Sequence, residues 1–194
     1  MCIRDRGKRP LLYFKNAEEW RAWLHENHHL ESGVDLVFYK VAAEEPSMRW
    51  EEAVQVAICY GWIDSTVRKI DDDRRKQYFC KRNAKSVWSA VNKAYIERLE
   101  KEGLIHDSGY KSIEIAKENG SWSALDDVEN GIIPEDLQTA FNNNPKAFEN
   151  YENFARGYRK SYLYWLNQAK REATRQKRIE QIVALCEQNL KQRS

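Results

Sequence analysis

Apolar positions along the chain follow two spacings, and the change between them separates a mixed first part from a helical last part. Apolar residues at three- and four-residue spacing predict helices over residues 16–28 and 48–60. Short runs that alternate or are rich in β-branched and aromatic residues predict strands at Leu11–Phe14, Val34–Lys40, Trp62–Ile70 and Arg74–Arg82. We therefore expect an α+β fold: a small, mainly antiparallel sheet with both helices packed on one face, followed by a helical C-terminal half. The order of the strands stays open.

Capping residues mark the ends of the predicted helices. Asn16 stands at the N-cap of the first helix, with Glu19 three residues further on. Ser47 is expected to cap the second helix, whose buried stripe includes Trp50. Gly61 fits the position just beyond the end of that helix, where a left-handed backbone is common.

Three consecutive aspartates, Asp71 to Asp73, predict a tight turn between the last two strands, because aspartate is favoured in turns. A β-hairpin is the simplest interpretation. Two further helices are expected after it, one capped by Ser86 or Ser89 and one by Asp107 or Ser108.

Four segments follow from these patterns. The opening MCIRDRG is typical of translated sequencing adapter, so residues 1–9 are expected to be non-native or disordered and the native N-terminus to be missing. Residues 10–120 form the predicted α+β core domain with the hairpin. Residues 121–133 are acidic and rich in turn residues, which predicts a linker or an ordered crossover. Residues 134–194 are predicted to be a helical region with short connections.

Charge is distributed unevenly, although the formal net charge is only +2. Residues 107–155 hold ten acidic residues and three lysines, and residues 156–194 hold ten basic residues and three glutamates. Either the two segments offset each other, or the basic one presents a surface to an acidic partner. Nucleic-acid binding through Arg156–Arg178, with its interleaved tyrosines and tryptophan, is not expected, because the balanced overall charge and the adjacent acidic segment oppose it.

The four cysteines, Cys2, Cys59, Cys80 and Cys186, predict neither a metal site nor a redox pair. None has CxxC spacing or a histidine at a ligand interval, so no metal and no cofactor is expected. Three lie inside apolar patterns, which favours buried free thiols of a reducing compartment. No apolar stretch reaches 18 residues, so no transmembrane segment is predicted. We expect a cytoplasmic protein, with the periplasm left open because the native N-terminus is expected to be missing.

Three histidines, His25, His28 and His29, close the first predicted helix. As helix C-terminal residues they would interact favourably with the helix dipole. The alternative is a metal or proton-transfer site, which no carboxylate or cysteine at matching spacing supports.

The stretch Gly61–Asn92 holds two tryptophans, a run of three aspartates and eight lysines or arginines. It contains no Gly-rich phosphate loop and no Ser/His/Asp or Cys/His pairing, so no catalytic residues are assigned. The ligand-binding candidates are Trp62, Asp64, Ser65, Lys69, Gln77, Arg82, Ser86, Trp88, Ser89 and Asn92.

Two alternatives stay open for the strongest of these candidates. Asp64 stands inside a strand, where a carboxylate is disfavoured, so it is expected to pair with a lysine or arginine of the facing strand or to contact a ligand. Trp88 and Ser89 are either a core anchor and a helix cap, or part of an anion site in which helix N-terminal amides, Lys85 and Arg82 converge.

Several motifs in order resemble the bacterial YdeI/OmpD-associated family, also labelled bacteriocin-protection or OmdA-like. They are Tyr39-Lys40, the run WEEAVQVAICYGWIDS that ends at Ser65, Lys69–Asp71, Gln77–Arg82, Ser86–Asn92 and Tyr162–Ile179. The likeness covers most of residues 10–190 and is strongest over Trp50–Asn92. It implies protection against bacteriocins or antimicrobial peptides and association with an outer-membrane porin, and it carries over no catalytic residue.

Two functions are expected from these observations. The first is a non-enzymatic binding or stress-protection role, with a protein partner or a small anionic ligand. The alternative is an enzyme or sensor of a small anionic metabolite that uses the face from Arg82 to Asn92.

Overall fold

A computed structural model describes residues 9–192 of the 194-residue chain. The chain divides into two compact units, and the boundary along the sequence falls between Ala124 and Leu125. The MCIRDRG opening and Cys2 lie outside the described residues, and so does the expectation made for residues 1–8. No helix within residues 9–192 is long and apolar enough to cross a membrane.

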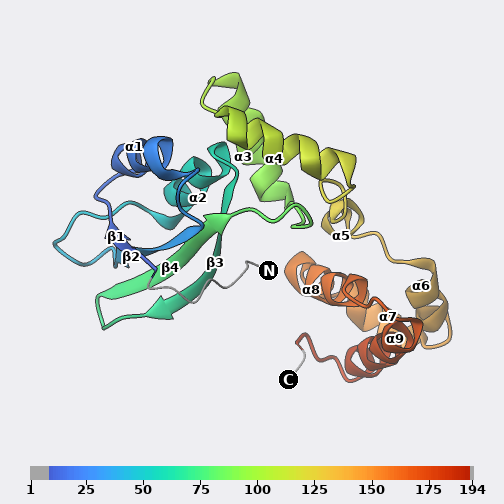
Figure 1. Cartoon of the computed structure of the whole chain (residues 1–194). Coiled ribbons are helices and arrows are strands. Elements are labelled where there is room, and N and C mark those ends of the chain that lie inside the picture. Colours follow the sequence, from blue (N-terminus) through green and yellow to red (C-terminus); the bar gives the residue numbers. More distant parts are fainter. Residues whose placement is uncertain (1–8, 193–194) are drawn as a thin grey trace. The chain divides into compact units, whose positions relative to one another are not determined.

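A four-stranded sheet forms the centre of the N-terminal unit (Figure 1). Its strands are β1 (Leu11–Tyr13), β2 (Gly33–Tyr39), β3 (Trp62–Lys69) and β4 (Arg74–Lys81). The spatial order is β1-β2-β4-β3, with β1 parallel to β2 and the other two pairs antiparallel. The expected α+β class, with a mainly antiparallel sheet and a helical C-terminal half, is confirmed.

Strands β3 and β4 form the predicted hairpin, and the aspartate run is its turn. The Asp71 carboxylate accepts hydrogen bonds from the backbone N–H groups of Asp73 and Arg74, at 3.1 and 2.8 Å. The side chain of Asp71 therefore accepts hydrogen bonds from N–H groups that would otherwise need a backbone carbonyl in the turn. The ladder shifts register between Asp64 and Val67, so β3 bulges close to its buried end.

Helices α1 (Ala17–Asn27) and α2 (Trp50–Cys59) cover one face of the sheet (Figure 1). Asn16 caps α1 as predicted, since its side chain accepts from the Glu19 N–H at 2.9 Å. The prediction for Ser47 is wrong: α2 begins later, and the Ser47 hydroxyl accepts from the Tyr39 N–H at 3.1 Å. Ser47 therefore connects the loop before α2 to strand β2 and does not cap a helix.

Two more helices, α3 (Ala90–Lys101) and α4 (Asp107–Glu118), complete the N-terminal unit. Ser89 caps α3, as one of the two predicted alternatives. For α4 both predicted caps are wrong, because the His106 side chain accepts from the Ser108 N–H at 3.2 Å. An imidazole nitrogen can replace a hydroxyl or carboxylate there, which explains why the usual capping residues misled the prediction.

The C-terminal unit is entirely helical within its described residues. It consists of α5 (Asp126–Asn130), α6 (Glu135–Asn142), α7 (Pro145–Glu152), α8 (Arg156–Asn167) and α9 (Glu172–Glu187). Phe141, Tyr151 and Leu166 lie in its separate apolar core. Ion pairs between Lys160 and Glu129 and between Arg175 and Asp136 join basic and acidic segments, as the offsetting interpretation of the charge pattern expects.

Cysteine burial follows the prediction only in part. Cys59 and Cys186 are buried free thiols, and burial raises the pKa of Cys186 to about 12. Cys80, in contrast, is disulfide-bonded, so the prediction of a free thiol is wrong at that position. Its place on β4 gives a sequence pattern no different from that of a buried thiol.

Candidate functional site

Asp64 is held by neutral donors, which corrects the predicted ion pair. Its carboxylate accepts from the Gln77 side-chain amide on β4 and from the Trp50 indole N–H on α2, the latter at 3.1 Å. The described ion pairs of the N-terminal unit do not include Asp64. Trp50 was predicted to be buried but is 36% exposed. The Gln77 side chain can reach Asp64 because it lies two residues from Phe79, the β4 partner of Asp64, and so on the same face of the sheet.

Arg82 and Trp88 form a stacked pair at the end of β4. The guanidinium carbon lies 3.7 Å from the centre of the buried Trp88 ring, a favourable cation–π geometry. One terminal nitrogen donates to the Val87 carbonyl at 2.5 Å. The other terminal nitrogen and Nε are buried, and neither has a hydrogen-bond partner within residues 9–192. Burial lowers the pKa of Arg82 to about 10, although the negative charge of Asp64 acts in the opposite direction.

Of the remaining candidates, some make contacts with residues close in sequence and others lie away from Arg82. The Ser89 hydroxyl accepts from the Asn92 N–H at 3.3 Å, so both residues belong to the cap of α3. Lys69 pairs with Asp72 at the turn, and Ser65 is exposed in the bulge. The ten candidates therefore do not converge on one pocket.

A basic cavity of about 440 Å³ lies beside Arg82, between the end of β4, the end of α1 and the start of α4. We call it the basic cavity. Its polar lining residues are His28, His29, Lys81, Arg82, Ser108, Lys111 and Ser112, with Trp62 among the aromatic ones. The lining that is described contains no aspartate or glutamate. Only Arg82 and Trp62 among the ten candidates contribute to it.

Backbone contacts place α4 against the end of α2 and so form one wall of the cavity. The Ser108 hydroxyl donates to the Tyr60 carbonyl at 3.1 Å, and the His106 N–H donates to the Cys59 carbonyl at 3.0 Å. Lys111 follows one turn later on an exposed face. The sequence did not identify Ser108, Lys111 and Lys81 as site residues. The contact between Ser108 and Tyr60 joins segments that are 48 residues apart, and no local motif indicates it.

Three of the four histidines, His25, His28 and His106, contact the Tyr60 ring next to this cavity, and His29 contacts His28. The His106 ring centre lies 4.7 Å from that of His28 and 5.9 Å from that of His25. The rings meet edge to face, and the described part of the chain contains no group of three or more His, Cys, Asp or Glu side chains placed to hold a metal ion. The His28 ring nitrogen Nδ1 lies 2.8 Å from the Leu24 carbonyl, consistent with a role in ending α1.

His106 should make the N-terminal unit less stable in acid. Burial first, and then the neighbouring His28, lowers its pKa. Since the folded-state pKa lies below the unfolded one, the neutral ring stabilises the fold above about pH 6.5, and this contribution is lost as pH falls through the folded pKa. His106→Asn should keep the cap of α4 and lose less stability than the wild type between roughly pH 7.5 and pH 5 in urea unfolding. An equal loss in both proteins would mean that other groups carry the acid sensitivity.

Two family matches cover the two units separately. Residues 12–112 match the family described as "Domain of unknown function (DUF8412)". Residues 130–189 match the family described as "Bacteriocin-protection, YdeI or OmpD-Associated", so that resemblance is confirmed for the C-terminal helices, while Trp50–Asn92 falls within the other match. No curated protein and no solved structure matches the chain. Residues 130–189 match only part of the chain, whereas residues 12–112 span more than half of it, so the chain belongs to the family described as "Domain of unknown function (DUF8412)".

Proposed function

We propose that the protein is a binding protein, and that its N-terminal unit takes up a small oxyanion, such as phosphate or a multiply charged carboxylate, in the basic cavity. The observation that carries this proposal is Arg82: two of its buried nitrogens have no hydrogen-bond partner within residues 9–192, and the described lining of the adjacent cavity has three cations and no carboxylate. A buried charge without an opposite charge is costly. An anion in the cavity would offset it through the protein interior, where charges interact more strongly than in water.

Direct contacts to such an anion would come from the exposed lysines. Lys81 and Lys111 line the cavity with ammonium groups, and Ser112 adds a hydroxyl on the same helix as Lys111. Charge-assisted hydrogen bonds of this kind are among the stronger polar contacts in proteins. The proposed site keeps Arg82 from the predicted anion site and replaces Lys85 and the helix N-terminal amides by residues of α4.

Ligand-induced thermal stabilisation tests the site. Phosphate, pyrophosphate and citrate are titrated separately, and at a hundredfold excess over its Kd a bound anion should raise the melting temperature by roughly 5–10 °C. Lys111→Ala should weaken the affinity about tenfold, because one charge-assisted hydrogen bond is lost, and the shift at the same anion concentration should then fall by roughly half. Lys85→Ala removes the same charge from a residue outside the cavity and should retain the response.

Two outcomes contradict the proposed site. One is a shift of equal size in the Lys111→Ala and Lys85→Ala variants, which would indicate general ionic stabilisation. The other is the absence of any shift with all three anions at millimolar concentration.

The family match of the C-terminal unit supports a protective role for the whole chain. The family description associates this segment with bacteriocin protection. A bacterial strain that lacks the gene should survive cationic antimicrobial peptides less well, and the wild-type gene should restore survival. If Lys111→Ala fails to restore it while Lys85→Ala succeeds, protection depends on the basic cavity. Unchanged survival after deletion would count against the protective role without bearing on anion binding.

A further inference from the structure

A second concavity of about 680 Å³ lies at the opposite end of the hairpin from Arg82. Its walls are the loop after β2, the first turn of α2 and the turn end of the β3–β4 hairpin. It is larger than the basic cavity and shares no lining residue with it. We call it the Trp50 pocket.

One wall of the Trp50 pocket is a half-open aromatic surface. Trp50 is 36% exposed, yet its indole N–H is bonded to the Asp64 carboxylate at 3.1 Å, so the ring is held in one orientation. Phe38 and Met48 are buried and form an apolar floor. A fixed, partly exposed tryptophan loses little conformational freedom when a flat ligand packs on it.

The rest of the lining is basic. The cations are Lys40, Arg49, Lys69, Arg74 and Arg75. Lys69 and Arg74 are neutralised within the turn by Asp72 and Asp71, at 2.5 and 2.6 Å. No ion pair to an acid is found within residues 9–192 for the other three, and Glu51 is the one other acid in the described lining.

We propose that the Trp50 pocket binds a planar aromatic anion, with its ring against Trp50 and its phosphate or carboxylate group against Arg49 and Arg75. Arginine suits this role because its planar fork matches both anionic groups. An apolar wall with a few convergent polar groups is also the usual composition of a small-molecule site. This site is independent of the oxyanion proposed for the basic cavity.

The indole N–H resonance of Trp50 reports on this pocket directly. It is assigned by its disappearance in Trp50→Phe, and phenyl phosphate, inorganic phosphate and phenol are then titrated by proton–nitrogen NMR. Phenyl phosphate should shift this resonance and bind at least tenfold more tightly than either fragment, because only it engages both walls. Arg49→Ala and Arg75→Ala should each weaken its binding about tenfold or more. Arg68→Ala removes a charge from an exposed β3 residue outside the pocket and should have little effect.

Three results would overturn the proposal. The first is equal affinity for phenyl phosphate and its two fragments. The second is binding that Arg49→Ala and Arg75→Ala leave unchanged. The third is a shift of the Trp62 indole resonance without one at Trp50, which would place the anion in the basic cavity and thereby support that site while removing this one.

Discussion

Replacing Gly109 with alanine is expected to destabilise the N-terminal unit by about 3 kcal/mol or more. A Cβ atom at this position of α4 would lie 2.2 Å from the Cys59 carbonyl oxygen and 2.8 Å from its carbon. Both are backbone atoms at the end of α2, so no side chain can rotate away. The approach is close from both sides, since a Cβ on Gly61 would lie 2.8 Å from the Ser108 carbonyl oxygen.

The loss can be measured by urea unfolding followed through tryptophan fluorescence. Six of the seven tryptophans belong to the N-terminal unit, with Trp165 the exception, so the signal reports mainly on that unit. Gly157→Ala on α8 is the control: a Cβ there meets nothing within 4 Å, and alanine is favoured over glycine in a helix. Equal stability of the wild type and Gly109→Ala would mean that α4 can move away from α2 at low cost.

The same contact has a functional consequence. Ser108, Lys111 and Ser112 reach the basic cavity because α4 lies so close to the end of α2. If Gly109→Ala displaces α4, its thermal response to anions should weaken even under conditions in which the variant remains folded. Fold and candidate site are thus connected through two glycines, Gly61 and Gly109.

The sequence predicted those parts of the fold that depend on neighbouring residues. The Asn16 and Ser89 caps, the Asp71 turn and the end of α2 at Gly61 each follow from a local pattern, and the structure has all of them. Each depends on a hydrogen bond or a backbone angle that involves residues close together in the sequence, so the types of those residues are enough to predict it.

The candidate site could be predicted only in part, because it depends on contacts between distant segments. Arg82 was identified from its place at the end of a strand, but its neighbours come from α4 and from the end of α1. Lys111 stands in a helix whose sequence pattern is weak, and nothing within that pattern indicates a contact with β4. Asp64 shows the same limit: its partners are Gln77 on β4 and Trp50 on α2, and the alternation of β3 does not show which side chains of other elements it meets.

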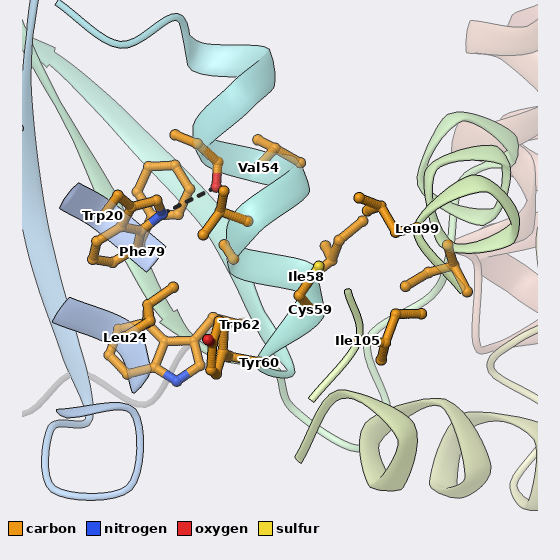
Figure 2. Close-up of a cluster of buried hydrophobic side chains, with 14 of the residues drawn as sticks. Trp20, Leu24, Val54, Ile58, Cys59, Tyr60, Trp62, Phe79, Leu99 and Ile105 are labelled. Carbon is orange, nitrogen blue, oxygen red and sulfur yellow. Dashed lines mark hydrogen bonds between the residues drawn. The ribbon is translucent and has the colours of Figure 1, made fainter. Parts of the chain in front are cut away.

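Trp20→Ala is expected to reduce the free energy of unfolding of the N-terminal unit by about 3–5 kcal/mol. Trp20 is completely buried between the sheet and α2 (Figure 2). Its ring stacks on Trp23 at 5.4 Å and meets Phe79 edge to face at 5.8 Å. Its indole N–H also donates to the Ala53 carbonyl at 3.2 Å, as the dashed line in Figure 2 marks. Truncation would therefore leave a large cavity and remove the indole hydrogen bond to the Ala53 carbonyl.

Two variants separate these contributions in urea unfolding followed by circular dichroism. Trp20→Phe keeps most of the ring volume but loses the donor, so its cost should be well below that of Trp20→Ala. Trp50→Ala removes an equally large side chain that is about one third exposed, and it should cost less than half as much, because less apolar surface returns to water. If Trp50→Ala cost as much stability as Trp20→Ala, the burial of Trp20 between the sheet and α2 would not be the reason for the large loss. Because a small domain has only about 5–15 kcal/mol of stability, Trp20→Ala should leave a substantial unfolded fraction at mild denaturant concentrations where the wild type is still folded.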